Sequence, residues 1–110
     1  RQPRSTLFPY TTLFRSIAEW SRETGLTLIN FTPGTGTNAD YTTPGMAGYK
    51  SSDVLWDYLL RFEERNRLGL NGAIVLVHLG THPDRTDKFY NRLGDLIDEL
   101  RRRGYGFGRF

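Results

Sequence analysis

Two histidines and three aspartates are the residues of this chain whose types and spacing could support proton transfer or metal binding. His78 is the polar residue near the end of an almost continuous apolar run, residues 73–79. An imidazole at the carboxyl end of a buried strand can pass a proton to a leaving group near neutral pH. The alternative is a core histidine whose ring is hydrogen-bonded to the backbone. The aspartates Asp40, Asp84 and Asp87 are further candidates, and each is also a common turn former or helix cap.

The second histidine, His82, stands four residues after His78. On a helix this spacing would place two metal ligands on one face. Gly80 and Pro83 make the segment a loop instead, so the helical geometry is not available. The Gly-rich run at residues 34–38 lacks the Lys-Ser/Thr ending of a phosphate loop. The sequence therefore predicts neither a helical metal pair nor a phosphate site.

The excess of positive charge lies at the start of the chain. Of the 15 basic and 12 acidic residues, three basic and no acidic ones fall in residues 1–16, so the remainder carries 12 of each. The only basic run in that remainder, residues 101–103, stands in the last turn of a predicted helix, where cations interact favourably with the helix dipole. We therefore expect no nucleic-acid partner.

Several classes of protein are excluded by what the composition lacks. The chain has no cysteine, which rules out thiol catalysis, disulfides and cysteine-based zinc sites. No apolar run approaches the ~20 residues of a membrane span, so no membrane partner is expected. The start does not have the pattern of a signal peptide. Localisation stays open, with a secreted or periplasmic parent among the alternatives, and so does the oligomeric state.

The stretch STLFPYTTLFRS, residues 5–16, fits neither a helical nor an alternating apolar pattern. Residues 6–16 match without a gap the translation of DNA that resembles a widely used sequencing-library adapter. We therefore expect residues 1–16 to be a non-native segment, set aside in fold reasoning as tags and fusion scars are. Residues 17–110 are then expected to be the C-terminal part of a longer domain.

The remaining chain predicts helices that alternate with strands. Helices are expected from Ile17 to a stop at Gly25, from about 52 to 66 with Ser51 or Ser52 as N-cap, and from 87 to 103 with Asp87 as cap and Gly104 as stop. Strands are expected at 26–31, 73–79 and 105–110. The predicted buried stripes are Leu55, Tyr58, Leu59 and Phe62 on one helix, and Phe89, Leu93, Leu96, Ile97 and Leu100 on the other.

This alternation predicts an α/β fold with parallel strands and right-handed crossovers, either a layered sheet or a barrel. Ligands bind beyond the carboxyl ends of the strands in such folds. Two loops, residues 32–43 and 78–84, would occupy that edge. They contain the candidate residues Asp40, His78 and His82.

Three segments together resemble the C-terminal part of bacterial polysaccharide deacetylases, a family of carbohydrate esterases: INFTPGTGTNADYTTP, GAIVLVHLGTHPDRTDKFYNRL and RRRGYGFGRF. The resemblance covers residues 17–110. Its most specific part is the family's Leu-x-Leu-x-His motif, matched here by Ile74, Leu76 and His78. The resemblance implies a partial, deformed β/α barrel that hydrolyses N- or O-acetyl groups, with an acetylated carbohydrate as partner.

The resemblance also implies roles for single residues. His78 would be the general acid that protonates the departing sugar nitrogen or oxygen, and Leu76 would line the pocket for the acetyl methyl group. Asp40 is the nearest match to the aspartate that orients this histidine. His82 is a second candidate substrate-binding residue.

The same resemblance implies a divalent metal, usually zinc, that activates water. In the family an Asp and two His from earlier strands hold this metal, and a second Asp acts as base; none of these motifs is present. We therefore expect this chain alone to be inactive and to hold no metal. The alternative function is a noncatalytic carbohydrate-binding module, in which Trp20, Tyr41, Tyr49 or Trp56 stacks on sugar.

Overall fold

The computed structural model describes residues 9–110. The first eight residues of the expected non-native segment lie outside this range. The chain divides into two compact units, with the boundary after Asn30.

The described residues of the first unit form the helix α2 (Pro9–Glu23), followed by an irregular segment. The end of the helix is built as the sequence predicts: Gly25 has a φ of 76°, and the N–H of Leu26 donates to the carbonyl of Ser21 at 2.8 Å. This is the Schellman arrangement, which needs a left-handed residue. The helix begins at Pro9, ahead of the predicted start at Ile17. It therefore runs continuously across residue 16.

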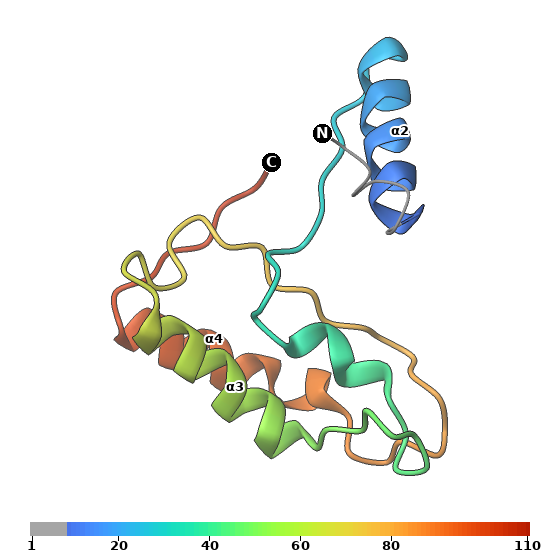
Figure 1. Ribbon diagram of the computed structural model, residues 1–110. Helices are drawn as coiled ribbons and strands as arrows, with labels where there is room; N and C mark the ends of the chain where they lie inside the picture. Colours follow the sequence, from blue (N-terminus) through green and yellow to red (C-terminus); the bar gives the residue numbers. More distant parts are fainter. Residues whose placement is uncertain (1–8) are drawn as a thin grey trace. The chain divides into compact units, whose positions relative to one another are not determined.

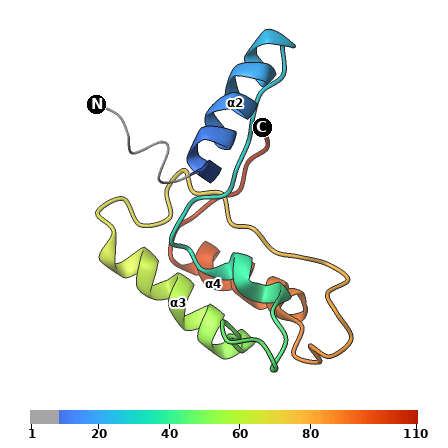
Figure 2. The same ribbon diagram turned by 45° about the vertical axis from the view of Figure 1, so that its right-hand side comes forward.

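The second unit is built on two helices that lie side by side, α3 (Ser52–Arg65) and α4 (Leu93–Arg102), as both ribbon views show (Figures 1 and 2). Ser51 caps α3, because its side chain accepts a hydrogen bond from the N–H of Val54 at 3.3 Å. Two short 3-10 turns accompany the helices: η1 (Thr37–Tyr41) and η2 (Phe89–Arg92). The predicted helix over 87–103 is thus a 3-10 turn followed by an α-helix, and Gly104 ends it with a φ of 98°.

The core of the second unit fills the space between α3 and α4. Leu55 and Leu59 meet Phe89, Leu96 and Leu100 of the predicted stripe of the C-terminal helix. Tyr58 and Leu93 were also expected in the buried stripes, but they are 42% and 36% exposed. Residues 73, 75 and 77 pack against this core from one side of an extended segment, the alternation expected of extended chain. The buried hydrophobic residues of this core are Leu55, Leu59, Leu70, Phe89, Leu96 and Leu100.

The predicted α/β fold, a partial β/α barrel, is wrong for the described part of the chain. Residues 9–110 contain no β-strand, and the expected strands at 26–31, 73–79 and 105–110 are extended or irregular. Just after the first of these segments, the N–H of Thr32 donates to the carbonyl of Ile74 at 2.8 Å. The N–H of Ile74 then donates to the Thr32 hydroxyl, at 2.9 Å. The Thr32 side chain thus binds the Ile74 N–H, which would have to donate to a backbone carbonyl if a β-ladder continued here.

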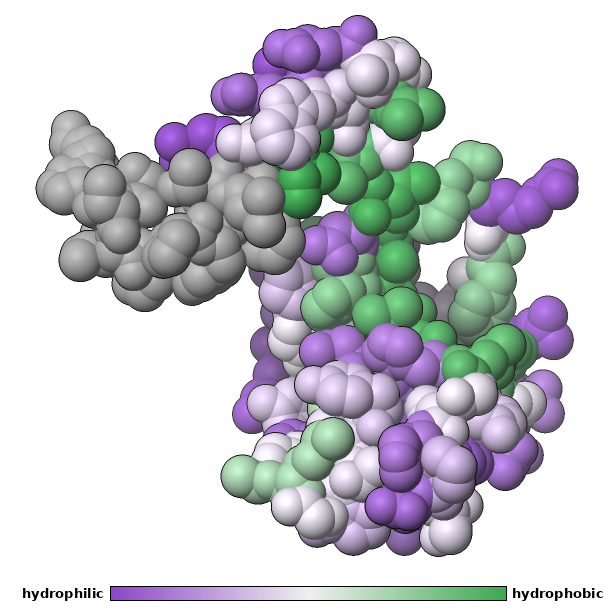
Figure 3. Space-filling model, turned by 90° about the vertical axis from the view of Figure 1, so that its right-hand side faces the viewer, coloured by the Kyte–Doolittle hydropathy of each residue, from purple (hydrophilic) through white to green (hydrophobic). Residues whose placement is uncertain are grey.

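Apolar side chains stand open at the surface where a sheet was expected. Leu28 is 50% exposed in the first unit, and Leu79 is 77% exposed in the second. Figure 3 shows such hydrophobic residues uncovered on one face of the molecule. A strand of a parallel sheet is normally covered on both faces, whereas the helices of the second unit cover one side of residues 73–77.

A network of ion pairs joins the C-terminal ends of α3 and α4. Arg103 donates to Glu63 and to Glu99, both at 2.7 Å. Tyr105 donates its hydroxyl to Glu63 at 2.9 Å and accepts from the N–H of Leu70 at 3.0 Å. These contacts tie the turn after α4 to the end of α3.

The ionisation of Glu99 makes the stability of the C-terminal ends of α3 and α4 depend on pH. Hydrogen bonds from Arg102 and then Arg103 lower the pKa of its carboxyl from 4.5 to about 2. Because the folded pKa lies below the unfolded one, the stabilisation is complete above the unfolded pKa and is lost as the pH falls toward the folded pKa. We expect the melting temperature to fall between about pH 4.5 and 2, and less steeply in Glu99→Gln. Thermal melts across this range test it, with exposed Asp98→Asn as control; equal falls in Glu99→Gln and wild type would contradict it.

Candidate active site

The candidate site is built on η1, a short turn that places Asp40 inside the second unit. Gly36 precedes η1 with a φ of 85°, and a Cβ there would lie 2.6 Å from the ring of Tyr58. Thr42 ends the turn, because its N–H and its hydroxyl both donate to the carbonyl of Ala39. Asp40 lies between these two ends and is 1% exposed. Position 36 therefore requires glycine, both for the left-handed backbone and for the close approach of η1 to α3.

Asp40 and His78 are in direct contact, although 38 residues separate them in the chain. The carboxylate Oδ1 lies 2.5 Å from His78 Nδ1, and Oδ2 accepts the backbone N–H of His78 at 2.7 Å. Figure 1 shows η1 beside the extended segment that carries His78. The two oxygens thus hold both the ring and the main chain of one residue.

This contact determines which ring nitrogen is left for chemistry. An ionised carboxylate can only accept hydrogen bonds, so the proton of a neutral His78 ring belongs on Nδ1. The Nε2 atom is then the one that can exchange a proton with a ligand, and the side chain is 40% exposed. The buried carboxylate orients the ring and compensates the positive charge that the ring gains on protonation.

Two further side chains lie near this histidine. The Tyr41 ring meets the His78 ring edge-on, with centroids 5.7 Å apart and an interplanar angle of 67°, and Tyr41 is 51% exposed. Leu76 is half-buried and stands two residues before His78. Since side chains alternate along extended chain, Leu76 and His78 share the side opposite Ala73, Val75 and Val77.

The remaining predicted residues point elsewhere. The ring of His82 accepts the N–H of Asp84 at 3.1 Å, and both side chains are exposed. Among the described residues, no group of three or more His, Asp or Glu side chains could hold a metal ion. The described residues therefore do not fit the catalytic metal that the resemblance implies.

Asp87 does not cap the helix that follows it, which corrects the sequence prediction. The carboxylate accepts the N–H of Ser52 at 2.6 Å, and the Ser52 hydroxyl donates to the Asp87 carbonyl at 3.2 Å. Asp87 therefore stabilises the start of α3. Burial opposes its ionisation, but the hydrogen bonds from Ser52 and the charges of Arg85 and Arg92 lower the pKa of Asp87 overall.

Sequence reasoning missed two cations close to the site. Arg85 is completely buried, and Lys88 binds Thr81 and His82 through its Nζ. The only signal was a run of charged residues in a turn, which is more often a solvated surface. The burial of Arg85 depends on the carbonyls of Thr42 and Lys50, which lie far from it in the chain, and the sequence pattern does not reveal them.

In the second unit, two of the aromatic residues proposed for sugar stacking have an arginine over their rings. Arg85 lies 5.3 Å from the ring centroid of Tyr49, and Arg92 lies 4.7 Å from that of Trp56. Trp20 is 58% exposed but belongs to the first unit. Tyr41 is the exposed candidate beside His78.

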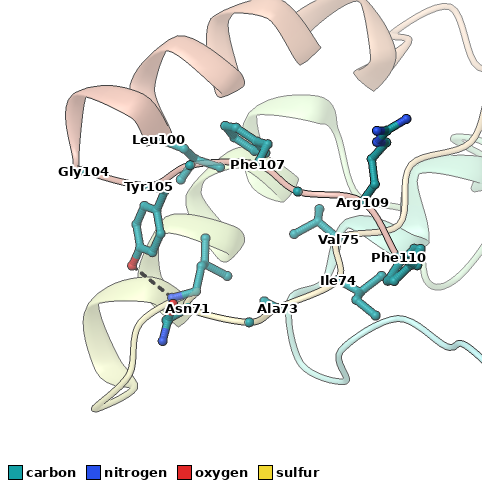
Figure 4. Close-up of a pocket in the computed structure, with 14 residues that line it drawn as sticks. Asn71, Ala73, Ile74, Val75, Leu100, Gly104, Tyr105, Phe107, Arg109 and Phe110 are labelled. Atoms are coloured by element: carbon teal, nitrogen blue, oxygen red, sulfur yellow. Dashed lines mark hydrogen bonds between the residues drawn. The ribbon is translucent and has the colours of Figure 1, made fainter.

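One cavity of the second unit is not lined by the Asp40–His78 pair. It has a volume of about 600 Å³ and is lined by residues 70–75, Leu100 and residues 104–110. Figure 4 shows Tyr105 at one wall, bonded to the backbone of residue 70, and Phe110 at the other end. Neither Asp40 nor His78 lines it. Size alone therefore does not identify the chemical site.

Comparisons with protein-family models, with curated proteins and with solved structures found no match to this chain. In the described residues, no helix combines the length and apolarity needed to cross a membrane.

Proposed function

We propose that this chain supplies the proton-donating part of a carbohydrate deacetylase, an enzyme that removes N- or O-acetyl groups from a polysaccharide or oligosaccharide. His78 is the general acid in this proposal, and Asp40 orients it. The observation that carries the proposal is the double contact of Asp40 with the ring and the N–H of His78. The resemblance of the surrounding sequence to polysaccharide deacetylases supports the same assignment.

The contact supports proton transfer for a geometric reason. A general acid must hold its proton toward the leaving atom. With Nδ1 bound to Asp40, Nε2 of His78 is directed away from the carboxylate, on a ring that remains 40% exposed. Leu76 shares this side of the segment and is proposed to contact the acetyl methyl group. Tyr41 offers an exposed ring beside His78, on which the sugar is proposed to stack.

The metal that activates water in this chemistry is proposed to be held by residues outside this chain. A catalytic metal normally needs three protein ligands, and the described residues do not supply such a group. The native reading frame upstream of residue 17 is therefore expected to encode them, as an Asp-Asp pair and a His-x-x-x-His motif. Deacetylation is proposed for that longer protein and not for the 110 residues alone.

The replacement Asp40→Asn tests the orienting role. Asparagine has nearly the same shape, but its amide would donate to Nδ1 and move the ring proton to Nε2. We expect acetate release by the longer protein to fall about a hundredfold to ten-thousandfold, because the same Asp→Asn change in a Ser-His-Asp triad keeps the geometry but favours the wrong tautomer. Assays with an acetylated chito-oligosaccharide and zinc measure this. Nitrogen NMR of the His78 ring should show the tautomer change in the same variant.

Two outcomes would contradict the proposal. If the longer protein binds the sugar but releases no acetate, the noncatalytic binding module is favoured. Full activity of Asp40→Asn with a changed tautomer would remove Asp40 from the mechanism. Asp84→Asn is the matched control, because Asp84 is exposed and contacts His82 instead of His78.

A further inference from the structure

The turn at residues 85–88, called here the anchoring turn, directs three charged side chains onto the backbone of three other segments. Arg85 donates to the carbonyls of Thr42 and Lys50, at 2.8 and 2.9 Å. Asp87 accepts the N–H of Ser52. Lys88 donates to the carbonyls of Thr81 and His82 at 2.9 and 2.8 Å. The anchoring turn thus joins both loops of the candidate site to the start of α3.

Arg85 is the most unusual member of this turn, because its side chain is 0% exposed. Burial of a guanidinium is costly unless hydrogen bonds replace water. Among the described residues, no carboxylate forms an ion pair with Arg85, and its Nε atom has no hydrogen-bond partner. Its bonds go mainly to main-chain carbonyls, so its position depends on the path of the loop at 42–50.

The contact with Thr42 acts on the turn that carries Asp40. Thr42 closes η1 through two hydrogen bonds to the carbonyl of Ala39, and its own carbonyl accepts from Arg85. Asp40 contacts His78 two residues before Thr42. Residues 40–42 and 78–85 are therefore joined at two points, one at the candidate site and one at the buried guanidinium.

We propose that Arg85 is a positioning residue for the Asp40–His78 pair. By holding the Thr42 carbonyl, it keeps η1 against residues 78–85, so that the carboxylate meets both the ring and the N–H of His78. Its effect on turnover rests on the proposed function. Its effect on the pair does not, and it can be measured without any substrate.

Hydrogen exchange of single amides in the 110-residue chain tests this in Arg85→Met. Methionine retains much of the apolar volume but donates no hydrogen bond. We expect the His78 amide to exchange about tenfold faster, which corresponds to a loss of about 1.4 kcal/mol in the local opening free energy when its hydrogen bond is weakened. The amide of Leu59, in the buried core of α3, should exchange at the same rate as in the wild type. Weakening of the His78 Nδ1 proton signal should accompany the change.

Arg103→Met is the matched control. Arg103 also makes several hydrogen bonds, but they join the ends of α3 and α4 and do not involve Asp40 or His78. Its loss should leave the His78 amide and ring signals unchanged. A variant that only destabilises the whole unit would accelerate His78 and Leu59 together.

The outcomes separate positioning from simple stabilisation. Unchanged His78 exchange in Arg85→Met, or equal acceleration of His78 and Leu59, would overturn the proposal. If Arg85→Met does not fold, Arg85→Lys decides: one ammonium lacks the planar fork of a guanidinium, so a smaller but selective acceleration at His78 is expected. Wild-type exchange at His78 in folded Arg85→Lys would also overturn it. The exchange rate of the His78 amide is measured without substrate. It would therefore stay the same even if the longer protein proved not to be a deacetylase.

Discussion

Replacement of His78 by alanine should lower acetate release by the longer protein about a hundredfold to ten-thousandfold. This is the contribution that a positioned general acid typically makes. The replacement removes the ring, while the backbone N–H can still donate to Asp40 Oδ2. One of the two contacts between η1 and this segment therefore remains. Initial rates with an acetylated chito-oligosaccharide and added zinc, measured for both proteins, give the ratio.

Two comparisons show whether the ring itself is responsible. His82→Ala removes a histidine from the same loop, but one whose ring is 61% exposed and turned to Asp84, so it should change the rate much less. Added imidazole should restore part of the activity of His78→Ala if the missing group is a proton donor. Near-native turnover of His78→Ala would return His78 to the alternative reading, a histidine that only ends an apolar segment.

Replacement of Phe89 by alanine should destabilise the second unit by about 3–5 kcal/mol, the usual cost of removing a buried aromatic ring. Phe89 is 1% exposed and packs in the cluster between α3 and α4. Small domains have total stabilities of about 5–15 kcal/mol, so this variant should be close to unfolding. Urea unfolding, followed through Trp56 fluorescence, measures the loss.

The chain offers a control of the same residue type. Phe107 is 56% exposed, and a surface replacement typically changes stability by less than about 0.5 kcal/mol. Phe107→Ala should therefore unfold at nearly the same urea concentration as the wild type. Equal losses for the two variants would mean that the cluster around Phe89 is not the core.

Local signals in the sequence predicted most helix ends correctly. Ser51 can satisfy a free N–H at the start of α3 by itself, and Gly25 and Gly104 can adopt the left-handed conformation that ends a helix. These properties depend on near neighbours in the chain. Asp87 failed as a cap because the same carboxylate can also bind an N–H from a distant helix, and it binds Ser52.

The strand predictions failed because an apolar pattern does not supply a partner. Residues 73–79 have the composition of a buried strand, and residues 73, 75 and 77 do pack on the core. A strand also needs a neighbouring backbone in register. The Thr32 hydroxyl takes the N–H of Ile74, which is then not available to a backbone carbonyl. No pairing pattern of this kind is visible in a single sequence.

The sequence by itself determined the cap at Ser51, the glycines that end α2 and α4, most of the apolar faces of α3 and α4, and the identity of Asp40 and His78 as candidates, because these depend on residue type and local spacing. Only the tertiary structure decided that the two side chains meet at 2.5 Å, that Asp87 serves α3, and that Arg85 is buried against carbonyls of the 42–50 loop. The physical reason is common to all three. Each depends on a hydrogen bond between groups more than 30 residues apart, whose geometry is set by the packing of α3, α4 and η1.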